Sequence, residues 1–165
     1  MEKIIVGEWE IEYDKTQTEE AYRKKGKGCD CIGCRNFYQA TQSVSNEIKT
    51  FFANFGIDMA KPAEIFDVHT YKNGKILYLG FYHIIGSLKK GGDVWEATGN
   101  KNGTETCAQN NMFKITDELE IGFTFQTAMV DEHFPANICQ MEISLWLPWL
   151  MEDRDYLEHF EIENQ

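Results

Sequence analysis

The stretch that decides the fold is a pair of apolar segments, Ile65-Phe66-Asp67-Val68-His69-Thr70-Tyr71 and Lys75-Ile76-Leu77-Tyr78-Leu79-Gly80-Phe81-Tyr82-His83-Ile84-Ile85-Gly86. Between them lies Asn73-Gly74, the strongest short signal for a β-hairpin, because both residue types tolerate the positive φ angles of a type I′ turn. Aromatic and β-branched residues fill both segments, as is typical of strands. Gly80 predicts a bulge or a close approach of another backbone. The centre of the chain is therefore an antiparallel hairpin.

More strands are predicted on the C-terminal side of the hairpin, where apolar residues alternate with polar or small ones. These segments are 112–115, 119–128 and 137–147, and a weaker strand signal covers 94–97. The run 98–106 is rich in Gly, Asn and Thr, so we expect an exposed loop there. The acidic tail from about Glu152 is expected to form a short helix or a partly loose end.

Before the hairpin, one strand is followed by helices. Acidic and apolar residues alternate over 8–13, which predicts a half-buried strand. Thr16 with Glu19 fits a capping box at the start of a short polar helix that ends near Lys25. Two apolar stripes with helical spacing come next, one at Cys34, Phe37, Tyr38 and Thr41 and one at Val44, Ile48, Phe51, Phe52 and Phe55, with Gly56 as the C-terminal cap. This order predicts an α+β fold: an antiparallel meandering sheet with the N-terminal helices packed on one face.

Length and composition narrow the class of protein. The 165 residues, 42% of them hydrophobic, suffice for a single domain over 1–165 with its own core. Twenty-seven acidic against 16 basic residues give a net charge of -11, which disfavours binding to nucleic acid and to anionic membranes. The longest apolar stretch, 76–85, is shorter than the roughly 20 residues of a membrane helix. We therefore expect a cytoplasmic protein. The sequence leaves open whether its partner is another protein or a second copy of the chain.

Three of the five cysteines lie within six residues, in Gly28-Cys29-Asp30-Cys31-Ile32-Gly33-Cys34. Closely spaced thiolates can occupy neighbouring corners of a tetrahedral zinc site. Cys29, Cys31 and Cys34 would supply three ligands, and the fourth ligand stays open, with Cys107, Cys139 or a histidine as candidates. A three-thiolate site would also suit copper(I).

Two other interpretations of these cysteines remain open. Cys31-Ile32-Gly33-Cys34 is a Cys-x-x-Cys motif at a predicted helix start, where the helix dipole and the basic run 23–27 would lower a thiol pKa and favour redox exchange. Alternatively, the cysteines are small buried residues that anchor the helix. Converging sulfurs about 4 Å apart would indicate a metal or redox site, whereas sulfurs in separate packing environments would indicate the anchor.

Several short motifs carry a resemblance. They are Cys-Asp-Cys-Ile-Gly-Cys-Arg-Asn-Phe-Tyr at 29–38, Phe-Gly-Ile-Asp at 55–58, Gly-Phe-Tyr-His at 80–83 and Pro148-Trp149. With these, the chain resembles a group of small uncharacterised bacterial proteins that carry a Cys-x-Cys-x-x-Cys-Arg-Asn unit. The resemblance implies that the unit is a feature of the type, and it brings no activity with it.

No complete catalytic constellation is found in the sequence, and an enzyme with its site in an aromatic cleft has no specific residue support. The sequence therefore favours a non-enzymatic binding or interaction protein whose cysteines anchor the helix or hold a structural zinc. The alternative is a thiol redox protein that uses Cys31 and Cys34.

Overall fold

The computed structural model describes residues 1–101 and 104–162, with side chains described for 1–99 and 108–162. It confirms the α+β fold, with helices and a mostly antiparallel sheet. The helices are α1 (Lys15–Lys24), α2 (Ile32–Ala40) and α3 (Asn46–Phe55), and the two 3-10 turns are η1 (Thr41–Ser43) and η2 (Asp155–Leu157). None of the described helices is long and apolar enough to cross a membrane.

The strands form one large sheet and one small ribbon. Their bounds are β1 (Glu2–Val6), β2 (Trp9–Tyr13), β3 (Glu64–Lys72), β4 (Lys75–Lys90), β5 (Trp95–Lys101), β6 (Thr104–Gln109), β7 (Phe113–Lys114), β8 (Leu119–Thr124), β9 (Ile138–Pro148) and β10 (Glu161–Ile162). The large sheet has eight strands along the path β1-β2-β4-β9-β8-β7, with β3 paired to β4 and β10 paired in parallel to β3. The strands β5 and β6 pair only with each other.

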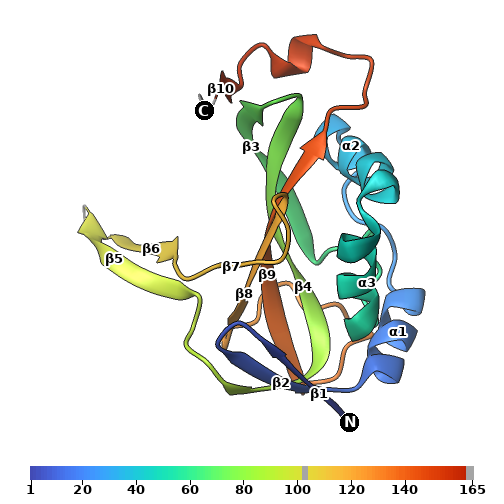
Figure 1. Cartoon of the computed structure of the whole chain (residues 1–165), viewed down its shortest axis with the longest axis vertical. Helices are drawn as coiled ribbons and strands as arrows, with labels where there is room; N and C mark the ends of the chain where they lie inside the picture. The colour runs from blue at the N-terminus through green and yellow to red at the C-terminus, as the bar shows by residue number, and fades with distance from the viewer. Residues whose placement is uncertain (102–103, 163–165) are drawn as a thin grey trace.

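The long strands β4 and β9 give the sheet two different faces. One face packs on the three helices, which lie together on one side of the sheet (Figure 1). Tyr78 and Tyr82 of β4 point to this side and are fully buried, where their rings contact Phe37 of α2 and Phe52 of α3. The face opposite the helices is called the open face below, and the β5–β6 ribbon projects from that side (Figure 1).

Several predicted elements are confirmed. The hairpin forms at Asn73-Gly74, and both turn residues have positive φ angles. Helices α2 and α3 lie where the apolar stripes predict them, and Gly56 ends α3 in the left-handed conformation with φ 76°. A Cβ atom on Gly80 would collide with the carbonyl oxygen of Glu64, so this glycine permits the close approach of β3.

Other expectations are wrong. The first helix begins before the proposed capping box, because the side chain of Asp14 accepts the backbone N–H of Gln17 at 2.9 Å and is the N-cap. The expected loop 98–106 instead carries the ends of β5 and β6, with 102–103 outside the described residues. The strand expected over 119–128 ends at Thr124, where Asp93 accepts hydrogen bonds from the Thr124 hydroxyl and the Phe125 N–H.

Candidate metal centre

The three neighbouring cysteines lie where the chain enters α2. Cys31 is the N-cap residue of the helix, and its side chain makes no capping hydrogen bond. Cys34 lies inside the first turn, and Cys29 precedes the helix in the segment that joins α1 to α2. Cys29 and Cys31 are exposed, whereas Cys34 is buried. A single short segment therefore presents two accessible thiols beside one that is fixed in the core.

The sulfur atoms of these residues converge. The Sγ atoms of Cys29, Cys31 and Cys34, called the cysteine cluster below, all lie within 4.8 Å of one another. A metal at 2.3 Å from tetrahedral thiolates would place the sulfurs about 3.8 Å apart. Since two of the three side chains are exposed, rotation about their χ1 angles can close this difference. The cluster is close enough to hold a metal ion, as the sequence spacing predicts.

Hydrogen bonding and burial shift the pKa values of two of these thiols in opposite directions. The backbone N–H of Cys31 donates to the Sγ of Cys29 at 3.3 Å, and this bond lowers the pKa of the Cys29 thiol. Burial raises the pKa of the Cys34 thiol, whose Sγ lies 4.0 Å from the carbonyl oxygen of Ile65 in β3. The Cys34 side chain therefore links α2 to the sheet, whereas the lowered pKa of Cys29 favours the thiolate form of that residue.

Side chains next to the cluster hold its backbone in place. The Tyr38 hydroxyl donates to the carbonyl oxygen of Cys29 at 2.9 Å, so that α2 holds the preceding segment against itself. Gly33 lies against the carboxylate of Asp67, where an added Cβ atom would be 2.6 Å from Oδ2. The same Oδ2 accepts a hydrogen bond from the Tyr156 hydroxyl at 2.9 Å, which brings the C-terminal segment to the start of α2.

The candidate fourth ligands whose side chains the structure describes do not lie with the cluster. Cys139 is buried in β9, where it pairs with Ile84, and it does not belong to the group of converging sulfurs. Cys107 belongs to β6 in the ribbon, on the opposite side of the sheet from α2 (Figure 1), and its side chain lies outside the described residues. Among the side chains that the structure describes, no histidine or carboxylate joins the three sulfurs as a fourth ligand.

No family model, curated protein or solved structure matches this chain. Its function is therefore inferred from the geometry of its own residues.

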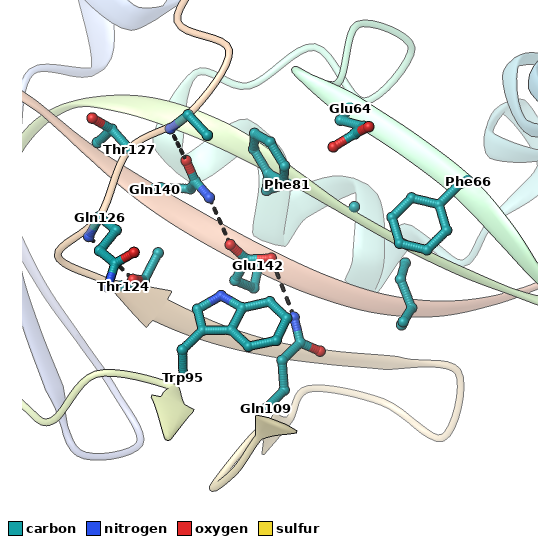
Figure 2. A pocket seen from close by; sticks show the side chains of 13 residues that line it. Glu64, Phe66, Phe81, Trp95, Gln109, Thr124, Gln126, Thr127, Gln140 and Glu142 are labelled. Atoms are coloured by element: carbon teal, nitrogen blue, oxygen red, sulfur yellow. Dashed lines mark hydrogen bonds between the residues drawn. The ribbon is translucent and has the colours of Figure 1, made fainter. Parts of the chain in front are cut away.

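The sequence interpretation missed a second polar cluster, which lies on the open face around Glu142 and Gln140 of β9 (Figure 2). Both residues are buried, with exposed fractions of 3% and 5%. The available signal is the alternation of β9, in which these polar residues interrupt an apolar strand at every second position. Such alternation normally indicates a solvated face, so it does not by itself reveal burial.

Proposed function

We propose that the chain is a non-enzymatic binding protein in which Cys29, Cys31 and Cys34 hold one zinc ion with a structural role. The observation that carries the proposal is the convergence of three sulfurs within 4.8 Å at the start of one helix. The hydrogen bond from the Cys31 N–H to the Cys29 sulfur supports it further, because such outer-shell bonds orient and stabilise thiolate ligands. The zinc would fasten the segment before α2 to the helix, and Cys34 would fasten the helix to β3.

Three protein thiolates leave one tetrahedral position for water or an external donor, since structural zinc usually has four ligands. The exposure of Cys29 and Cys31 makes such a position accessible to solvent. Copper(I) would instead accept three thiolates alone. A reducing compartment such as the cytoplasm suits the site, because Cys29, Cys31, Cys34 and Cys139 are all free thiols.

Metal analysis of native protein purified without chelator tests the proposal. We expect about one equivalent of zinc per chain, and loss of that metal in Cys29→Ser and in Cys31→Ser. The matched control is Cys139→Ser, which removes a cysteine outside the cluster and should retain the metal. Less than roughly 0.3 equivalent of any metal, together with three freely reactive thiols, would refute the site.

A thiol redox protein is the second candidate. Cys31 is exposed at the N-cap of α2, and Cys34 lies buried one turn further, which is a common arrangement of an attacking and a resolving thiol. This function requires a mild disulfide oxidant, which is reduced to two thiols as it accepts the two electrons and two protons that Cys31 and Cys34 lose on forming their disulfide. Peptide mapping after oxidation with oxidised glutathione should then find a Cys31–Cys34 link that dithiothreitol reverses. A metal-loaded protein that resists this oxidation would favour zinc instead.

A further inference from the structure

A second site, separate from the cysteine cluster, lies on the open face. A cavity of about 410 Å³ is bounded by strands β3, β4, β8 and β9 of the sheet and by the β5–β6 ribbon (Figure 2). The sheet register places Phe81 of β4 and Gly122 of β8 on either side of Glu142 of β9. Because the helices cover only the other face, this cavity is open to solvent between the sheet and the ribbon.

Glu142 is the charged group at the floor of this cavity. Its side chain is almost fully buried, yet both carboxylate oxygens have hydrogen-bond donors. The Gln140 amide donates to Oε1 at 2.6 Å, and the Gln109 amide of the ribbon donates to Oε2 at 3.2 Å (Figure 2). Accepting on both oxygens is the bonding pattern of an ionised carboxylate.

The orientation of Gln140 is fixed by its other contacts. Its Oε1 accepts the backbone N–H of Ala128 at 2.9 Å, a group that can only donate. The same oxygen lies 3.3 Å from Nε2 of the buried His83, which must therefore carry its proton on that nitrogen. The amide NH₂ group consequently has to face Glu142. The carboxylate is thus held in a preorganised position before any ligand arrives.

The described lining of the cavity offers this carboxylate no cationic partner. Among the side chains that the structure describes, its lining contains the carboxylates of Glu142 and Glu64 and several neutral amides and hydroxyls, but no lysine or arginine. Burial raises the pKa of Glu142, and the negative charge of Asp93 adds to this effect. A buried ionised group without a counterion is unfavourable, so a positive charge entering the cavity would be stabilised.

Aromatic rings complete the walls. Phe66 and Trp95 line the cavity with exposed fractions of 47% and 37%, and Phe81 lies beside Glu142. Large exposed apolar side chains around a cavity are typical of ligand sites. The faces of such rings also attract ammonium groups. Apolar walls, a carboxylate floor and a described lining without basic residues together specify the chemistry of a ligand.

We propose that this cavity binds a small organic cation, an amine with an apolar body, whose ammonium group pairs with Glu142 while its body contacts the rings of Phe66, Phe81 and Trp95. A small anion would be repelled by the two lining carboxylates. A neutral ligand would leave the Glu142 charge without a partner. The site is independent of the proposed zinc, because it lies across the sheet from α2 and shares no residue with the cysteine cluster.

Titration with three probes of one shape tests the proposal. The probes are 2-phenylethylamine, 2-phenylethanol and phenylacetate, which present a cation, a neutral hydroxyl and an anion on the same phenyl body. Binding to the full chain is followed by NMR shifts of the Trp95 indole N–H, assigned with Trp95→Phe. We expect the amine to bind at least about tenfold more tightly than the alcohol, and phenylacetate to bind most weakly.

Two variants connect this preference to the carboxylate. Glu142→Gln keeps the shape of the side chain and should abolish the preference for the amine over the alcohol. The matched control is Glu120→Gln, which removes one charge from the exposed side of the neighbouring strand and should keep the preference. An amine that binds no more tightly than the alcohol to the unmodified chain would overturn the proposal. A preference that survives in a folded Glu142→Gln variant would overturn it as well.

Discussion

The backbone N–H of Cys31 donates a hydrogen bond to the sulfur of Cys29 over 3.3 Å, so the residue that opens α2 also orients the thiol two positions before it. This bond needs no side chain other than the acceptor cysteine. It follows from the spacing Cys-x-Cys immediately before a helix, where N–H groups have no partner within the helix. Two of the three proposed ligands are therefore organised by the helix start itself.

Removal of the proposed zinc should loosen this helix start. With a strong zinc chelator, we expect the free energy of unfolding to fall by about 2–4 kcal/mol, because a ligand that binds only the folded state stabilises it by mass action. Thermal denaturation with and without chelator measures the change. The double variant Cys29→Ser, Cys31→Ser should unfold at the same temperature in both conditions. A chelator effect of equal size in this variant would mean that the metal binds elsewhere.

Substitution of Gly33 should disturb the cysteine cluster through the contact of this glycine with Asp67 of β3. In Gly33→Ala the new Cβ atom would lie 2.6 Å from Oδ2 of Asp67, so α2 or the Asp67 side chain must shift. We expect a loss of about 1–3 kcal/mol in stability, as for other overpacked sites, and weaker zinc binding. Gly26→Ala is the control, since its Cβ would meet nothing within 4 Å. Equal zinc content and stability in the two variants would contradict the expected role of the Gly33 contact.

Much of the architecture follows from local patterns in the sequence. The turn at Asn73-Gly74 and the helix end at Gly56 are both encoded by residues that tolerate positive φ. The alternation in β4 also separates Tyr82 from His83 across the sheet, as neighbouring residues in a strand must be. The convergence of the cysteines is also predictable from local sequence, because all three lie within six residues of one another.

The features that were not predictable depend on contacts between distant segments. Polar residues on both sides of β5 and β6 give no apolar face, so a projecting ribbon looks like a loop in the sequence. Glu142 looks like a solvated residue of an alternating strand until the ribbon brings Gln109 across it. Asp67 reaches Gly33 at the start of α2 only because β3 lies against α2. Each of these relationships is a property of tertiary packing, which a local sequence pattern does not by itself reveal.

Asn36 is a further case, and its substitution should be costly. Its amide is fully buried, where it donates to the Tyr78 hydroxyl at 3.0 Å and accepts the backbone N–H of Leu150 at 2.7 Å. Asn36→Ala would leave these groups unsatisfied, so we expect a loss of about 2–4 kcal/mol in the free energy of unfolding. Urea denaturation measures it. The control Asn54→Ala changes an exposed helical asparagine and should differ from the unmodified chain by less than about 0.5 kcal/mol.

The stability of the chain should depend on pH through Glu142. Burial raises the pKa of this carboxyl above its usual 4.5, so between these two pKa values the folded state binds more protons than the unfolded state. The contribution of Glu142 to the free energy of unfolding is therefore fully present below the pKa that this carboxyl has in the unfolded state. It is lost as pH rises through the pKa that it has in the folded state. Glu142→Gln lacks this loss. The melting temperature of this variant, relative to that of the unmodified chain, should therefore rise as pH rises from 4.5.

The difference between the two proteins isolates Glu142 from other titrating groups. His83 acts in the opposite direction, because burial lowers its pKa and its protonation destabilises the fold as pH falls. This contribution is common to both proteins and cancels in the difference. Glu120→Gln should differ from the unmodified chain by a small offset without this trend. A difference for Glu142→Gln that stays flat from acidic to alkaline pH would mean that the carboxylate carries no buried charge, and the cation site would lose its physical basis.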